Sequence, residues 1–222
     1  MIRVVLVDDQ ALFRTGIRML VASQGDLEVV GEAPDGREAI EVVRATRPDV
    51  VLMDIRMPVM DGIEATRQIV ALPVPAGADA PRVIVLTTFD LDEAALRAIR
   101  AGASGFLLKD SDPEFLLAAI RTVHAGTAVI APSATRELVA RLDRTRSPVP
   151  PEFGELTARE HGMFLLAARG LSNAEIAAGE FVSEATVKTH ISRVLAKLGL
   201  RDRVQLVVYA YEHGLVERHP GG

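Results

Sequence analysis

Short apolar runs and helical patterns alternate through the first 125 residues of the chain. The runs are rich in Val, Ile and Leu and stop at polar residues, which is typical of strands buried on both faces of a parallel sheet. They predict strands at Ile2–Val7, Leu27–Ala33, Val50–Asp54, Arg82–Thr87 and Gly105–Leu108. Apolar residues between them recur at helical spacing, beginning with Leu12, Ile17, Leu20 and Val21. Five βα units in succession predict an α/β fold with a doubly wound, five-stranded parallel sheet.

The helices of this part follow from the same pattern. The first helix is expected to follow Asp9 and to end at Ser23. The others are expected at Gly36–Thr46, Gly62–Ala71, Leu91–Ala101 and Asp112–Ala125. Asp112 stands at the N-cap of the last one, with Pro113 at its first position. Between the third helix and the fourth strand, Pro73–Pro81 is predicted to form a loop rich in Pro, Ala and Gly.

The pattern changes in the second half of the chain. Ala131–Leu142 carries one helical stripe and predicts a short helix, whereas Arg141–Pro151 is basic, then proline-rich, and reads as a semi-rigid tether. We therefore expect a first domain at 1–121, a linker at 122–151, an all-α second domain at 152–216 and a tail at 217–222.

Residues 152–216 contain the pattern of a helix-turn-helix. Thr157 and Glu160 predict a capping box at the start of a helix that ends at Gly170. A short helix then starts at Asn173, and Ser183 caps a longer one over Glu184–Leu198. Two helices separated by a three-residue turn, the second of them basic, predict a DNA-binding motif.

Composition and charge narrow the function classes. The 222 residues include no cysteine, no apolar run near the length of a membrane span, and no signal-peptide pattern, so we expect a soluble, cytoplasmic protein that contacts no membrane. The net charge of −5 argues against general nucleic-acid binding. Lys188–Arg203, however, holds five basic residues and one acid, which is a local footprint for phosphate contacts.

The outward positions of the basic helix are candidates for contacts with double-stranded DNA. Its apolar face is predicted at Val187, Ile191, Val194, Leu195 and Leu198. Lys188, Thr189 and Ser192 point away from that face and are candidates for base edges. Arg193, Lys197 and Asn173 are candidates for phosphates. The complete predicted set is Asn173, Thr186, Lys188, Thr189, Ser192, Arg193 and Lys197.

Polar residues at the strand ends of the first domain predict a reaction site. Asp8, Asp9, Asp54, Thr87 and Lys109 follow or end successive strands and belong at one edge of the sheet. Three crowded carboxylates require a hard cation or raised pKa values, and oxygen ligands suit Mg²⁺. Asp54 is the expected nucleophile, forming an acyl phosphate, with Lys109 and Thr87 binding phosphoryl oxygens.

Two related sites fit less well. An aspartyl-phosphate phosphatase needs a second acid two residues after its nucleophile, where this chain has Arg56. A flavin site needs a phosphate-binding loop after the first strand, where Asp8 and Asp9 would repel phosphate. A stand-alone enzyme is therefore not expected.

Four stretches, VLVDDQ, VVLMDIRMPVMDG, VIVLTTFD and GFLLKD, resemble the receiver domain of two-component response regulators, which has a flavodoxin-like fold. The resemblance implies phosphorylation of Asp54 by a histidine kinase. It implies Mg²⁺ bound by Asp9, Asp54 and the main-chain carbonyl of Arg56, with Asp8 acting through water. Thr87 becomes the switch hydroxyl and Lys109 the phosphate-binding lysine. Phe106 occupies the aromatic switch position, although plain core packing explains it equally well.

Four further stretches, LTARE, GLSNAEIA, VSEATVKTHISRVLAKLG and RDRVQLVVYA, resemble the LuxR/NarL-type DNA-binding domain. The resemblance implies a four-helix unit whose last helix, Val204–His213, often mediates dimerisation on DNA. Gly162 inside the first helix and the pair Gly179-Glu180 depart from the family pattern. The main hypothesis is a DNA-binding transcriptional response regulator that forms homodimers when it is phosphorylated or bound to DNA. The alternative, supported only by Gly179-Glu180, is a phosphorylatable interaction module with impaired or phosphorylation-independent DNA binding.

Overall fold

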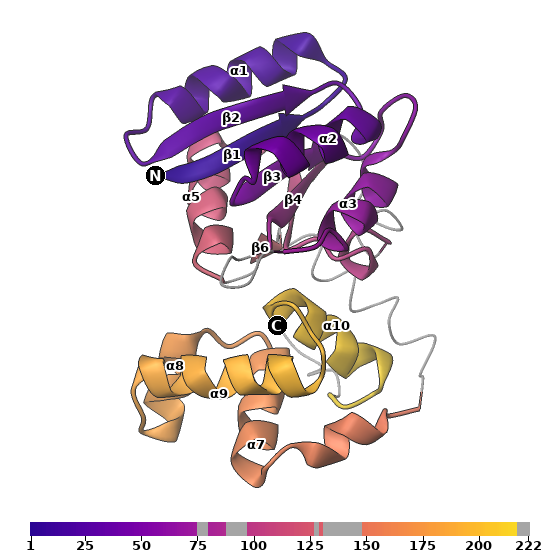
Figure 1. The fold of residues 1–222 in the computed structure, drawn as a ribbon. Helices are drawn as coiled ribbons and strands as arrows, with labels where there is room; N and C mark the ends of the chain where they lie inside the picture. The colour runs from indigo at the N-terminus through magenta and orange to yellow at the C-terminus, as the bar shows by residue number, and fades with distance from the viewer. Residues whose placement is uncertain (75–79, 88–96, 127–128, 131–147, 217–222) are drawn as a thin grey trace. The chain divides into compact units, whose positions relative to one another are not determined.

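The computed structural model describes residues 1–74, 80–87, 97–126, 129–130 and 148–216 (Figure 1). The chain divides into two compact units, Met1–Thr135 and Arg136–Gly222, each with a hydrophobic core of its own. The predicted domain limits at 121 and 152 remain predictions. The predicted linker helix, Ala131–Leu142, lies outside the described residues, as does most of the predicted loop between Pro73 and Pro81.

The first unit is built on a parallel sheet with the strand order β2-β1-β3-β4-β5-β6. The five predicted strands are confirmed as β1 (Ile2–Val7), β2 (Leu27–Ala33), β3 (Val50–Asp54), β4 (Arg82–Thr87) and β5 (Gly105–Leu108). A sixth strand, β6 (Val129–Ile130), pairs parallel with β5 and was not predicted. Two residues are too few to show a periodicity, so no sequence pattern marks this strand.

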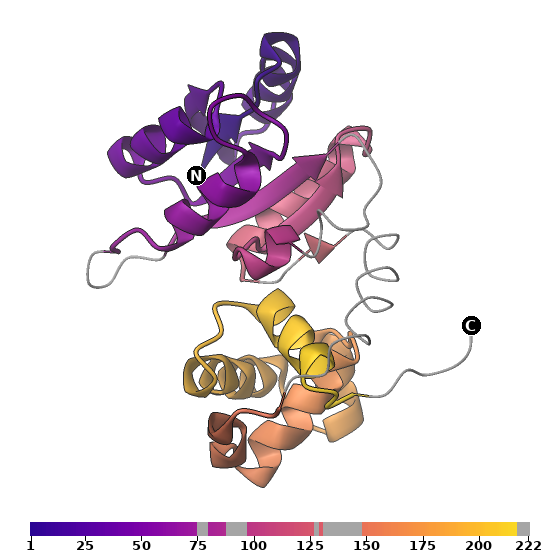
Figure 2. The same ribbon diagram turned by 90° about the vertical axis from the view of Figure 1, so that its right-hand side faces the viewer.

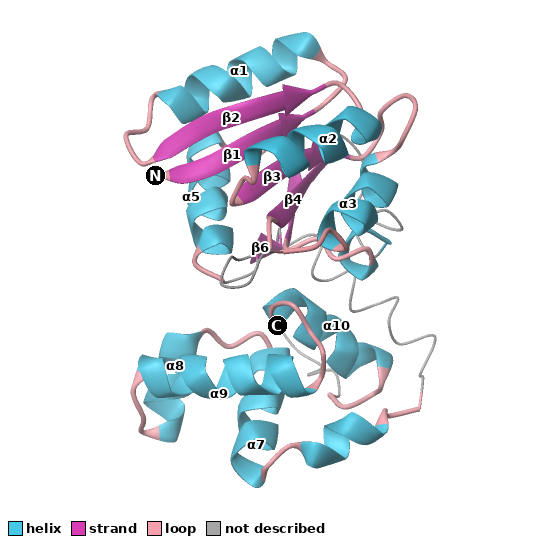
Figure 3. Ribbon diagram, viewed as in Figure 1, coloured by secondary structure: helices cyan, strands magenta, loops and turns pink. Residues whose placement is uncertain are grey.

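Helices cover both faces of the sheet, as the doubly wound arrangement requires (Figure 3). Val4 and Leu6 of β1 lie in the core beneath α1 (Ala11–Ala22) and α5 (Pro113–His124). Val5 and Val7 point to the opposite face and pack with residues of α2 (Gly36–Thr46) and α3 (Gly62–Val70). Because side chains alternate along a strand, a strand buried on both faces must be apolar throughout.

The ends of these helices follow the predicted chemistry. Asp112 caps α5 by accepting a hydrogen bond from the main-chain N–H of Glu114 at 2.7 Å, as predicted. Asp35 and Asp61 cap α2 and α3 in the same way. Of the predicted helix Leu91–Ala101, the structure describes residues 97–101, and 97–100 are helical.

One residue of the apolar pattern that predicted α1 does not face the core. Leu12 is 87% exposed, and the neighbouring Phe13 packs against the core together with Ile17 and Leu20. Both Leu12 and Phe13 are apolar, so the pattern alone could not decide which of them opens the buried stripe.

The second unit is helical (Figures 1 and 2). A 3₁₀ turn, η1 (Pro151–Glu155), precedes the helices α7 (Ala158–Ala168), α8 (Asn173–Glu180), α9 (Glu184–Lys197) and α10 (Arg203–Glu212). The predicted capping box of Thr157 and Glu160 is confirmed, and Ser172 with Glu175 forms a second one at α8. Among the residues that the structure describes, no helix is both long and apolar enough to cross a membrane.

The two departures from the family pattern are accommodated without disruption. A Cβ atom at Gly162 or Gly179 would meet no atom within 4 Å, so both glycines lie on open helix surface. Glu180, at the end of α8, forms an ion pair with Arg159 of α7. The carboxylate therefore joins two helices at a position where the family usually has an apolar contact.

Candidate functional site

The sheet register places the predicted site residues at one level. Val7 of β1 is aligned with Met53 of β3, so the next residues along, Asp8 and Asp54, emerge side by side. Asp54 is aligned with Leu86 of β4, and Thr87 is aligned with Leu108 of β5. Thr87 and Lys109 therefore follow at the same edge, which is the carboxyl edge where open α/β sheets carry their ligand sites.

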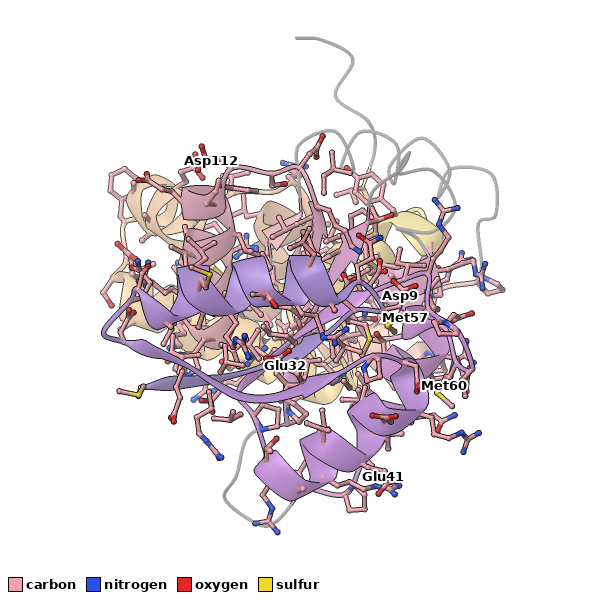
Figure 4. The ribbon with its side chains drawn as sticks, turned by 90° about the horizontal axis from the view of Figure 1, so that it is seen from above. Asp9, Glu32, Glu41, Met57, Met60 and Asp112 are labelled. Carbon is pink, nitrogen blue, oxygen red and sulfur yellow. The ribbon has the colours of Figure 1, made fainter. Side chains whose placement is uncertain are left out.

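The three predicted acids form one cluster. Ligand oxygens of Asp8, Asp9 and Asp54 lie within 4.8 Å of one another. Lys109 closes the cluster from β5, with its Nζ 2.6 Å from Asp8 Oδ2 and 3.0 Å from Asp54 Oδ2. Asp8 and Asp54 are 3% and 5% exposed, whereas Asp9, which is labelled in Figure 4, is exposed. Two carboxylates of the cluster are thus buried, and the third is open to solvent.

The charge balance of the cluster favours a cation. Burial raises the pKa of Asp54, the bond and charge of Lys109 oppose that rise, and the negative charge of Asp8 adds to it. The cluster contains the three carboxylates and the ammonium group of Lys109, so its net charge is negative when all four groups are ionised, and the cluster is partly buried. The ligand atoms that the three aspartates offer are all oxygens, which are the ligands that Mg²⁺ prefers. These residues therefore fit that ion.

The loop after β3 fixes the main chain of Asp54. Gly62 donates its N–H to the carbonyl of Ile55 at 2.9 Å, and a Cβ at Gly62 would lie 1.8 Å from the carbonyl oxygen of Asp54. Ile55 in turn donates its N–H to Asp54 Oδ1 at 2.8 Å. The loop between Ile55 and Gly62 contains a tight γ-turn centred on Val59, whose φ is 65°. The main-chain N–H of Met60 closes this turn by donating to the carbonyl of Pro58 at 2.7 Å.

The remaining predicted receiver residues lie close to this edge. Thr87 is 6% exposed at the end of β4. Phe106 is fully buried in the core beneath α2 and α3. Arg56 is exposed just after Asp54, and its predicted carbonyl contact with a metal stays a prediction. The aromatic position is thus a core position, which is compatible with both of the roles weighed for Phe106.

Two residues of α1 reach the cluster without having been predicted. The ring of Phe13 lies 4.8 Å from Lys109 Nζ, at cation–π distance. Arg14 donates from Nη1 to the main-chain carbonyl of Asp8, and its Nε lies 3.4 Å from Glu32 Oε2. Helical spacing indicated a helix here, but a bond to a main-chain oxygen leaves no mark on the sequence.

In the second unit, α9 has the predicted division between a buried and an open face. Val187, Ile191 and Val194 are buried in the core, whereas Lys188, Thr189, Ser192 and Arg193 are exposed. Ser183 caps the helix at the main-chain N–H of Thr186, and its hydroxyl lies 2.9 Å from the Thr186 hydroxyl. The N-terminal turns of α9 therefore present polar side chains on a frame that the core holds in place.

Other predicted DNA contacts are engaged within the unit itself. Lys197 Nζ lies 2.8 Å from Glu160 Oε2 and 3.0 Å from the Glu155 carbonyl. Asn173 accepts a bond from Arg203 at 3.0 Å, and Arg203 also donates to the carbonyl of Leu171. Two of the five basic residues counted in the sequence, Lys197 and Arg203, thus make contacts within the unit. Of the other three, Lys188 and Arg193 lie on α9 and are exposed.

Comparisons with known proteins agree with both units. The response regulator receiver domain matches residues 4–121, and the luxR family of bacterial regulatory proteins matches residues 154–210. The chain belongs to the response regulators. Its LuxR-type second unit makes it a DNA-binding transcriptional regulator of the two-component type.

Relatives match this response regulator along almost its whole length. The uncharacterized transcriptional regulatory protein YxjL of Bacillus subtilis is 42% identical over 219 residues, covering 97% of this chain and 98% of the relative. The response regulator protein VraR of Staphylococcus aureus is 39% identical, covering 97% and 99%. The crystal structure of ChrA, the response regulator of a heme-sensing two-component system, is 37% identical with a TM-score of 0.51, covering 97% and 98%. The predicted family and fold class are confirmed.

Proposed function

We propose that this response regulator is switched by phosphorylation of Asp54 by a partner histidine kinase. The observation that carries the proposal is the cluster in which Lys109 lies between the buried carboxylates of Asp8 and Asp54. Neither carboxylate has a packing reason to be there, because burying a charge is costly unless a function or a partner compensates.

The transfer requires little of the protein beyond positioning and charge compensation. A carboxylate oxygen of Asp54 attacks phosphorus, the O–P bond forms as the bond to the donor breaks, and the donor atom keeps the electron pair. Mg²⁺, when bound by Asp9, Asp54 and the Arg56 carbonyl, with Asp8 acting through water, would neutralise charge on the phosphoryl oxygens. Lys109 would exchange its contact with Asp54 for a phosphoryl oxygen, and Thr87 would donate its hydroxyl to another.

The output would be binding of a homodimer to a DNA operator. Lys188, Thr189 and Ser192 would read base edges in the major groove, and Arg193 would contact phosphate. Thr186, Asn173 and Lys197 would reach DNA only by exchanging contacts that they already make. Inside the first unit, Thr87 and Phe106 would carry the change away from Asp54, and Phe106 could do so only through packing because its ring has no hydrogen-bonding group.

Incubation with a small acyl-phosphate donor and Mg²⁺ tests the phosphoacceptor. We expect the wild-type chain to acquire a hydroxylamine-sensitive phosphoryl label and Asp54→Ala to acquire none. Asp49→Asn is the matched control, because Asp49 directly precedes the same strand at its opposite end and accepts a bond from the Arg3 N–H at 2.8 Å. Undiminished labelling of Asp54→Ala would place the nucleophile elsewhere.

The alternative, an interaction module with impaired or phosphorylation-independent DNA binding, has less support than the main proposal. It rested on Gly179-Glu180, and Glu180 is paired with Arg159 while α8 runs through both residues to its end. This arrangement supports the main proposal, in which α9 contacts DNA.

A further inference from the structure

Residues of α1 and β2 contact the main chain that carries the acidic cluster, or contact each other beside it. Arg14 donates to the main-chain carbonyl of Asp8 and lies beside Glu32 of β2. Figure 4 labels Glu32 and Asp9, the two ends of this connection. Glu32 also accepts from Arg18 at 3.2 Å, so one carboxylate holds two arginines of α1.

The carbonyl that Arg14 binds belongs to the peptide that joins Asp8 to Asp9. The main-chain N–H of Asp8 already bonds the Ala33 carbonyl at 3.1 Å, and its Oδ1 accepts from the Gln10 N–H at 2.8 Å. Arg14 supplies a side-chain hydrogen bond to the carbonyl of the following peptide plane. The rotation of that plane sets where Asp9 leaves the chain, and so how the exposed carboxylate faces the buried ones.

We propose that Arg14 is a positioning residue that, anchored by Glu32, orients the Asp8–Asp9 peptide so that the carboxylates converge on a divalent cation. The inference rests on the proposed function, since it concerns the cation of the same site. Like charges repel, so an unclamped loop would relax by turning Asp9 outward and would have to be reordered when the cation binds. Removing partners that orient metal ligands typically weakens metal binding about 10- to 100-fold.

The direction of the effect separates positioning from simple electrostatics. Arg14→Ala removes a positive charge near the cluster, and charge alone would make a divalent cation bind more tightly. Loss of positioning makes it bind more weakly. Arg18→Ala is the matched control, because it removes the same charge from the same helix and the same partner, Glu32, and Arg18 is the more exposed of the two arginines.

The experiment is a calorimetric Mg²⁺ titration of the full-length chain without phosphodonor. We expect Arg14→Ala to raise the dissociation constant about 10-fold or more and Arg18→Ala to change it less than about 2-fold. Arg14→Lys keeps the charge and can reach one of the two acceptors, so we expect an intermediate constant. This variant also decides the question should Arg14→Ala fold poorly, as monitored by circular dichroism.

The outcomes distinguish this inference from the function on which it rests. A wild-type chain that binds Mg²⁺, with Arg14→Ala equal to Arg18→Ala or tighter than wild type, would overturn the positioning role alone. A wild-type chain that binds no Mg²⁺ would overturn the proposed cation site and the positioning role with it.

Discussion

Gly62 lies against the main chain of Asp54 with no room for a side chain. A Cβ there would approach the Asp54 carbonyl oxygen to 1.8 Å and its carbonyl carbon to 2.8 Å, and a backbone group cannot swing aside as a side-chain end can. We expect Gly62→Ala to lower the free energy of unfolding by about 1–3 kcal/mol and to displace Asp54. Hydrogen exchange of the strand amides measures the loss in the first unit.

Gly16 is the control for this substitution in the same unit. It lies within α1, and a Cβ there meets nothing within 4 Å. Gly16→Ala should therefore stabilise the helix by about 0.5–1 kcal/mol. Equal effects of the two substitutions would contradict the close approach at Gly62.

At the residue scale, the sequence predicted that Asp54, Asp8 and Lys109 lie together at one edge of the sheet, and the structure places them there. They could be placed because each is a polar residue that ends or directly follows a buried strand, which is a strong signal. The contacts of Phe13 and Arg14 with the cluster could not be predicted, since they depend on which side of α1 faces the sheet and on a main-chain acceptor. Leu12 was misplaced for the same reason.

At the element scale, one carboxylate connects the first turn of α7 with the end of α9 in the DNA-binding unit. Glu160 completes the capping box of α7 at Thr157 and also accepts from Lys197 at the end of α9. The bond from Lys197 and the main-chain N–H of Thr157 lower the pKa of Glu160 from 4.5 to about 2. The ionised form is therefore favoured by folding.

This pKa predicts a specific loss of stability in acid. A carboxylate whose pKa is lower in the folded state stabilises the protein above its unfolded pKa and loses that contribution as the pH falls through the folded value. We expect the stabilisation by Glu160 to be complete above about pH 4.5 and to disappear toward pH 2. Glu160→Gln should be less stable than the wild type at pH 7, and it should lose less stability than the wild type between about pH 4.5 and pH 2.

Tyrosine fluorescence during urea unfolding measures this effect in the correct unit, because the only two tyrosines of the chain, Tyr209 and Tyr211, both lie in α10. Glu155→Gln is the control, since Lys197 bonds the main-chain carbonyl of Glu155, which the substitution retains. Parallel pH profiles of wild type and Glu160→Gln would refute the role of Glu160.

Most elements could be predicted because period, caps and turn residues agreed. The strands β1 to β5, the capping box at Thr157 and the cap at Ser183 follow from local rules. The strand β6 could not be predicted, because its two residues join the sheet only through their partner β5. The pairing of Glu180 with Arg159 was also missed, since 21 residues separate them in the chain.

At the scale of the whole molecule, the proposed function requires that the receiver changes the DNA affinity of the second unit. Coupling of this kind is typically worth 1–3 kcal/mol, or about 5- to 150-fold in affinity. We expect beryllium fluoride with Mg²⁺, which mimics the phosphoryl group on Asp54, to tighten operator binding within that range. Fluorescence anisotropy with DNA from upstream of the chain's own gene measures the change.

Two variants separate the halves of this coupling. Asp54→Ala should remove the response to beryllium fluoride and leave basal DNA binding unchanged. Lys188→Ala should weaken operator binding in both states, because Lys188 is proposed to read a base edge. A beryllium fluoride response that persists in Asp54→Ala would break the link between the receiver site and DNA.

The short strand β6 is the last part of the first unit that the structure describes. Ile130 is aligned with Phe106 of β5, and Phe106 lies three residues before Lys109 in the chain. β6 is thus a hydrogen-bonded neighbour of β5 within the sheet, and a shift of β5 would act on β6 directly through the backbone, whatever side chains the two strands carry.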